Sequence, residues 1–157
     1  MKNDMEAPPR HFLLPGTIFA HPGEHLVMTV LGSCVSVCLW DCSTRIGGIN
    51  HYMLPLWNGE GLPTPRYGNI AIELLVNRML ELGCRKSSMV AKIFGGANVM
   101  PGTGIYAIGD RNIILAANLL SDHSIPIVCD ETGGDSGRRI IFNTGTGVAY
   151  LRRTKQA

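Results

Sequence analysis

The stretch TVLGSCVSVCLWDCSTRIGGINHYMLP, residues 29–55, decides the fold of this region because it has the pattern of a β-hairpin. Small or polar residues alternate with Val35, Val37 and Leu39, and a period of two is typical of a half-buried strand. A polar segment at Cys42–Thr44 follows, and a second extended run leads to His51. We therefore predict two antiparallel strands joined by a short turn.

The register of this hairpin would bring a thiol and an imidazole together. If Cys42-Ser43 forms the centre of the turn, Asp41 pairs with Thr44, and by the same count Cys34 pairs with His51. Directly opposed residues share a face, with Cβ atoms ~4.5 to 5.5 Å apart. A slip of one residue would send the two side chains to opposite faces. The pairing of Cys34 with His51 is therefore a sharp geometric prediction.

Composition limits the class of protein. The chain has 157 residues, a formal net charge of +2 and only 17% charged residues, which gives no basic footprint for nucleic acid. No apolar run approaches the ~18 residues of a membrane span, and the polar N-terminus does not resemble a secretion signal. We expect one cytoplasmic domain over residues 1–157, with residues 1–10 forming a loose terminus.

The remaining pattern predicts many strands and two helices. Helices are expected over residues 69–82 and 110–121, the second with Ile113, Ile114, Ala117 and Leu120 on its inner face. Residues 12–20 and 24–31 should pair as one hairpin, and residues 138–142 and 148–152 as another. Without regular βαβ alternation, a doubly wound fold is disfavoured. We predict an α+β fold, a β-sandwich or strongly bent mixed sheets with two main helices packed outside.

The chemistry of residues 29–51 fits a thiol nucleophile. Cys34 needs its thiolate form to attack, and an imidazolium at His51 would lower the pKa of the thiol and later protonate a leaving group. The backbone N–H groups at Gly32 and Ser33 are candidates for holding an oxyanion, and the hydroxyl of Thr29 is a candidate for orienting the imidazole. The alternative from the residues alone is a buried structural cysteine and a structural histidine.

A metal cluster of Cys34, Cys38 and Cys42 is disfavoured by strand geometry. Residues four apart on a strand are separated by roughly 13 Å, which is too far for two thiolates to share a metal ion. Cys38 is better interpreted as a small core residue. Five cysteines without CxxC spacing also indicate free thiols rather than a disulfide framework.

The segments LGSCVSVCLWD and GGINHYMLP together resemble the signature of the CheD family, the chemoreceptor glutamine deamidases. Further similar segments are LLPGTIF, KIFGGANVM, IGDRN and DETGG, so the resemblance covers about residues 12–152. It implies a fold similar to the catalytic domain of the cytotoxic necrotizing factor toxins. It also implies that Cys34 is the nucleophile and His51 the catalytic histidine, and that the family's threonine corresponds to Thr29.

The implied activity is hydrolysis of glutamine side-chain amides on methyl-accepting chemotaxis receptors, through a thioester, without metal or cofactor. The resemblance implies an alternative from another class of function. CheD-like proteins are also regulatory partners that bind and stimulate CheC-type phosphatases, and this role needs no catalysis.

Overall fold

The computed structural model describes residues 6–98 and 107–154, which form nine strands, two α-helices and one short 3-10 helix. The strands are β1 (Arg10–Phe12), β2 (Thr17–His21), β3 (Leu26–Leu31), β4 (Val35–Asp41), β5 (Ile46–His51), β6 (Met89–Gly95), β7 (Ile127–Thr132), β8 (Arg138–Asn143) and β9 (Ala149–Arg153). The helices are α1 (Gly68–Glu81) and α2 (Ile108–Asp122), with the 3-10 helix at Lys86–Ser88.

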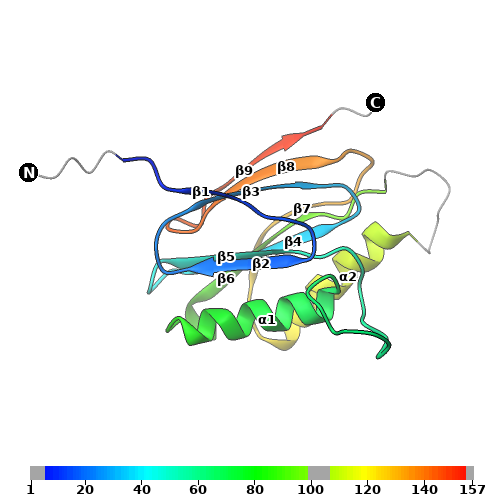
Figure 1. The fold of residues 1–157 in the computed structure, drawn as a ribbon, viewed down its shortest axis with the longest axis horizontal. Helices are drawn as coiled ribbons and strands as arrows, with labels where there is room; N and C mark the ends of the chain where they lie inside the picture. The colour runs from blue at the N-terminus through cyan, green and yellow to red at the C-terminus, as the bar shows by residue number, and fades with distance from the viewer. Residues whose placement is uncertain (1–5, 99–106, 155–157) are drawn as a thin grey trace, which may run out of the picture.

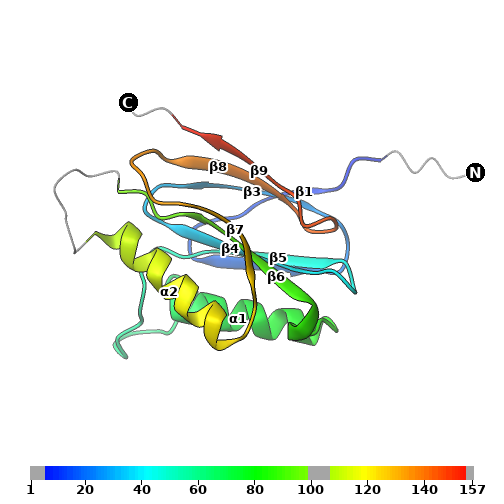
Figure 2. The same cartoon turned by 180° about the vertical axis from the view of Figure 1, so that it is seen from behind.

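The strands form two stacked sheets. One has four strands in the order β1-β3-β8-β9, and the other has five in the order β2-β5-β4-β6-β7. Both are mixed, because β1–β3 and β6–β7 are parallel while the other neighbours are antiparallel. Both helices cover the outer face of the five-stranded sheet, so the described chain has three layers (Figures 1 and 2). The predicted α+β class with helices outside is confirmed.

The five-stranded sheet lies between two apolar cores, which explains the sequence of β4. Val35, Val37 and Leu39 belong to the core beneath the helices. Cys38 is only 1% exposed and belongs to the core between the sheets, as predicted for a small core residue. A strand alternates its side chains between faces, so a strand buried on both faces is apolar on both. Alternate residues over 34–40 thus belong to two different cores, and neither face of this strand is exposed to solvent.

The pairing of the two N-terminal extended segments differs from the prediction. β2 pairs with β5 in the five-stranded sheet, whereas β3 pairs with β1 and β8 in the other sheet, so the expected hairpin is wrong. Phe19 of β2 and Val27 of β3 instead pack into the same core from opposite sheets. An alternating pattern shows that one face of a strand is buried, and it is the same whether the two strands pair in one sheet or face each other from two sheets. The C-terminal hairpin, β8 with β9, is confirmed.

The turn between β4 and β5 is longer than the sequence pattern predicts. Asp41 pairs with Ile46, so four residues rather than two connect the strands, and Arg45 adopts a positive φ of 58°. Asp41 Oδ1 accepts hydrogen bonds from the backbone N–H groups of Ser43 (2.7 Å) and Thr44 (3.2 Å). This Asx-type turn, closed by Arg45 in the left-handed region, shifts the register by two residues.

Part of the segment predicted as a loose terminus lies among the described residues. Of the predicted loose segment 1–10, residues 1–5 lie outside the described residues, and Arg10 begins β1. The backbone N–H of Leu26 donates to Pro9 O at 2.9 Å, which ties this segment to β3. None of the helices in the described ranges is long and apolar enough to span a bilayer.

Candidate active site

Cys34 lies on the three-residue connection that crosses from one sheet to the other. Leu31 ends β3 in the four-stranded sheet and Val35 begins β4 in the five-stranded sheet. The carbonyl groups of this crossover are held in place. Gly32 O accepts from the N–H of Ala97 at 3.0 Å, and Cys34 O accepts from the N–H of Gly96 at 2.9 Å. The half-buried Cys34 is therefore presented by a fixed backbone.

His51 ends β5 and is oriented by Thr29 of the opposite sheet. The imidazole is 2% exposed, and its Nδ1 lies 2.7 Å from Thr29 Oγ1. Thr29 is fully buried, and its hydroxyl donates to Leu13 O at 2.9 Å. A hydroxyl has one hydrogen, so when Thr29 donates it to Leu13, it can only accept from His51. This arrangement assigns the ring proton to Nδ1 and leaves Nε2 unprotonated, as a general base requires.

Cys34 and His51 share a face but are not directly opposed, which corrects the predicted register. Val35 bridges to Tyr52, and the same count places His51 opposite Ser36, two residues beyond Cys34. Because the shift is an even number of residues, both side chains still point between the sheets, where Cys34 packs on the inter-sheet core and His51 meets Thr29. Diagonal neighbours of this kind have Cα atoms ~7–8 Å apart. Within the described part of the chain, no hydrogen bond joins the two side chains.

Burial makes the resting pair electrically neutral. Removal from water lowers the pKa of His51 from 6.5 to about 4, and it raises the pKa of the Cys34 thiol despite a hydrogen bond from the residue's own N–H. The prediction that an imidazolium at His51 lowers the pKa of the thiol is therefore wrong for the free protein. The arrangement suits a neutral histidine that removes the thiol proton during attack.

The backbone donors predicted at Gly32 and Ser33 lie next to Cys34 on the crossover. Their N–H groups form no hydrogen bond to the backbone within residues 6–98 and 107–154. The carbonyl groups of Gly32 and Cys34 accept from backbone N–H groups, and that of Ser33 accepts from Asn112 Nδ2. All three residues are half-buried. N–H groups without a backbone partner beside a nucleophile, on a backbone fixed by its carbonyls, are candidates for an oxyanion site.

Asn112 of α2 is a site residue that the sequence analysis missed. Its Nδ2 donates to Ser33 O at 3.0 Å and to Met53 O at 3.1 Å. Of the predicted inner face, Leu120 is buried and Ile113 packs against the core, whereas Ile114 is 59% exposed. The buried positions of the helix are Gly109, Asn112, Ala116 and Leu120. A polar residue in an otherwise apolar buried stripe was the signal that could have revealed it.

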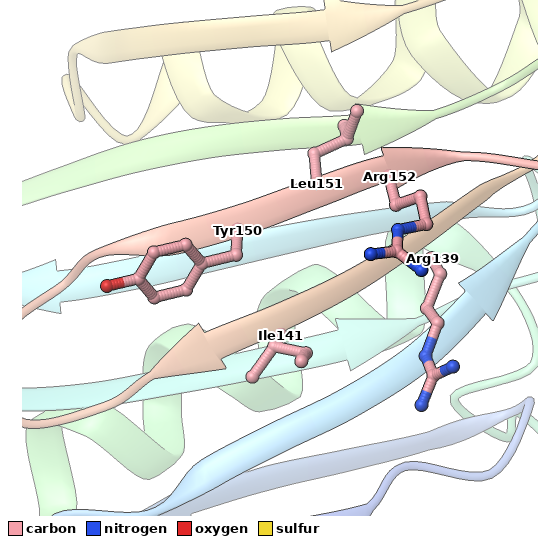
Figure 3. Close-up of a pocket in the computed structure, with 5 residues that line it drawn as sticks. All are labelled: Arg139, Ile141, Tyr150, Leu151 and Arg152. Carbon is pink, nitrogen blue, oxygen red and sulfur yellow. The ribbon is translucent and has the colours of Figure 1, made fainter.

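A pocket of about 350 Å³ lies on the outer face of the four-stranded sheet, away from these residues. Its lining comes from β8 and β9 and comprises Arg139, Ile141, Tyr150, Leu151 and Arg152 (Figure 3). It contains none of Cys34, His51 and Thr29. In the described ranges, no three histidine, cysteine or acidic side chains are grouped to hold a metal ion.

The fold and site define a class: a two-sheet sandwich with outer helices that carries a cysteine, a histidine and a threonine where the chain crosses between its sheets. The family model for CheD chemotactic sensory transduction matches residues 53–153. The chain is 51% identical over 148 residues to a probable chemoreceptor glutamine deamidase CheD of Trichlorobacter lovleyi, covering 94% of this chain and 92% of the relative.

Proteins of the same name from two other bacteria are also similar. The relative from Sulfurimonas denitrificans is 40% identical, with 93% of this chain and 97% of the relative covered. The relative from Rhodospirillum rubrum is 41% identical, with 95% of this chain and 85% of the relative covered. The chain belongs to the CheD family.

Proposed function

We propose that this protein is a cytoplasmic deamidase that hydrolyses glutamine side-chain amides of methyl-accepting chemotaxis receptors to glutamates. The names of its relatives support the reaction and the substrate class. The observation that carries the chemistry is the 2.7 Å contact between His51 Nδ1 and Thr29 Oγ1 on the face that Cys34 shares. It fixes the orientation of a neutral imidazole and leaves its Nε2 free to act as the base. The activity is proposed for residues 1–157 acting as one CheD-like domain.

The first half of the proposed reaction forms a thioester. His51 Nε2 takes the thiol proton as Cys34 Sγ attacks the glutamine Cδ, so a C–S bond forms and the amide oxygen becomes negative. The backbone N–H groups at Gly32 and Ser33 stabilise this oxyanion. His51 then transfers its proton to the amide nitrogen, the C–N bond breaks and ammonia leaves. The product is a γ-glutamyl thioester of Cys34.

The second half hydrolyses the thioester with the same residues. His51, neutral again, takes a proton from water as the water oxygen attacks the thioester carbon. The C–S bond breaks, the sulfur regains the proton, and the glutamate side chain is released. Thr29 accepts from Nδ1 throughout and stabilises the transient imidazolium without titrating itself. The balance is one amide and one water converted to one carboxylic acid and one ammonia.

Incubation with a receptor cytoplasmic fragment tests this proposal. Each deamidated glutamine adds about one mass unit, and peptide mapping locates it. We expect the wild type to deamidate, Cys34→Ala to be inactive, and Cys42→Ala to match the wild type. Cys42 is a suitable control because its thiol is exposed in the β4–β5 turn, so its removal costs no core packing. Equal background shifts for wild type and Cys34→Ala would refute the enzyme proposal.

The alternative is a regulatory module that binds and stimulates a CheC-type phosphatase. It predicts phosphatase stimulation that survives Cys34→Ala, whatever the outcome of the receptor assay. The two roles are compatible, but only the enzymatic role requires the hydrogen-bonded His51 and Thr29.

A further inference from the structure

The side chain of Asn112 connects the two segments that carry the proposed catalytic pair. Asn112 is fully buried, and its Nδ2 donates to Ser33 O at 3.0 Å and to Met53 O at 3.1 Å. Ser33 is the residue before Cys34, and Met53 lies two residues after His51. One amide group thus links the backbone beside the nucleophile to the backbone beside the base.

A backbone pair completes this connection. The N–H of Val35 donates to Tyr52 O at 3.1 Å, and the N–H of Tyr52 donates to Val35 O at 3.0 Å. Tyr52 also donates its hydroxyl to the backbone oxygen of Asn112 at 2.6 Å. The crossover and the end of β5 are therefore held both to each other and to α2.

Helix α2 also holds the other side of the crossover. Gly109, one turn before Asn112, packs so closely that a Cβ there would overlap the carbonyl oxygens of Gly96 and Ala97. The N–H groups of Gly96 and Ala97 are the donors to Cys34 O and Gly32 O. The helix thus presses the 96–97 segment against the same crossover that Asn112 binds.

The side-chain amide of Asn112 uses its NH₂ group fully but leaves its oxygen without a partner. Two carbonyl oxygens face the amide, so the NH₂ group must point toward them. The Oδ1 atom is then buried without a partner among the described residues. Buried polar atoms are normally paired, and an orphaned acceptor is unfavourable. Fold stability alone does not account for an amide at this point of an apolar helix face.

We propose that Asn112 is a positioning residue, which fixes the spacing between Cys34 and His51 by clamping Ser33 O and Met53 O. This inference rests on the proposed function, because it assigns Asn112 a role in that reaction. A shift of about 1 Å in a reacting group can lower a rate about 100-fold. Since Cys34 and His51 are diagonal neighbours rather than a directly bonded pair, their spacing depends on this backbone connection.

The test compares Asn112→Ala and Asn112→Asp with Leu120→Ala. An aspartate keeps the shape of asparagine but loses its NH₂ group. Leu120 lies on the same helix face eight residues further along and is fully buried, so Leu120→Ala is a control for the loss of α2 packing. Each variant is assayed with the receptor fragment at a temperature where its unfolding curve shows it fully folded. Alkylation of Cys34 by iodoacetamide, measured against pH, is a second readout that needs no receptor.

We expect both Asn112 variants to lose about 10- to 100-fold in kcat with little change in KM, because positioning rather than binding is lost. Leu120→Ala should keep the wild-type kcat. At neutral pH, Cys34 of the Asn112 variants should be alkylated at the rate of a His51→Gln protein rather than at the wild-type rate.

Folded Asn112 variants with wild-type kcat and alkylation profile would overturn the inference. So would a failure of both variants to fold while Leu120→Ala folds, because Asn112 would then be a folding residue. An inactive wild type would refute the proposed function instead, and the alkylation profile would still decide the role of Asn112.

Discussion

Acid should destabilise this protein through His51 well above the pH at which carboxylates are protonated. The folded state holds His51 neutral, with a pKa of about 4, whereas the unfolded chain binds its proton near 6.5. Between these values the unfolded state binds more protons, so the free energy of unfolding falls as pH falls. The stabilisation from the neutral imidazole is complete above 6.5 and is lost on the way down to 4.

The size of the effect follows from the two pKa values. The interval of 6.5 minus 4 corresponds to a limit of about 3 kcal/mol at 1.36 kcal/mol per pK unit. At pH 5 the loss should reach about 2 kcal/mol, since the unfolded histidine is then almost fully protonated and the folded one is not. The lowered pKa of Asp41 adds a loss only below 3.8, because its carboxylate is already ionised above that value in both states.

Urea unfolding of wild type and His51→Gln between pH 4.5 and 7.5 measures this loss. The glutamine side chain keeps a group that can bond to Thr29 but does not titrate. The variant will differ from the wild type in absolute stability, so the informative quantity is the slope against pH. We expect the wild-type free energy of unfolding to fall by about 2 kcal/mol more than that of the variant between pH 7 and 5. Parallel curves would show that His51 is not held neutral, and the assignment of a free Nε2 base would then fail.

Two further predictions concern the neighbours of His51. Thr29→Val should lower the free energy of unfolding by about 1–3 kcal/mol, because it leaves the buried Nδ1–H without an acceptor. It should also slow deamidation, whereas Thr29→Ser should have a stability and a deamidation rate close to those of the wild type. Equal values for the two variants would show that the Thr29 hydroxyl has no role in the site. Brief iodoacetamide treatment followed by peptide mass mapping should modify Cys34 before Cys38, because Cys34 is half-exposed and burial strongly raises the pKa of Cys38. Faster modification of Cys38 would contradict the exposed position of Cys34.

The sequence pattern predicted the face of each residue in the hairpin better than it predicted the register. The alternation around β4 requires Cys34 and Cys38 to share a side, whichever turn follows. The length of the turn depends on the Asp41 carboxylate, which also accepts from the N–H of Arg85 at 2.9 Å and from Ser88 Oγ at 2.8 Å. These partners lie more than forty residues away, so no local pattern contains them. The error of two residues preserved the predicted face.

The contacts between layers were beyond local patterns for the same reason. A period of two shows that β2 and β3 each bury one face, but it does not show whether they pair side by side or face each other. Thr29, the candidate for orienting the imidazole, nevertheless meets His51 across the sandwich. Asn112 was missed because the predicted inner face contained apolar residues only, whereas the buried face also includes this amide.

The site exists only where the three layers meet. Cys34 comes from the crossover, His51 from the five-stranded sheet, Thr29 from the four-stranded sheet, and Asn112 from the helix layer. Separation of the two sheets alone would remove Thr29 Oγ1 from Nδ1, so the imidazole would lose the contact that fixes its tautomer and its orientation. Partial opening of the sandwich should therefore abolish catalysis before the chain unfolds, so that activity reports the docking of the two sheets more sensitively than secondary structure does.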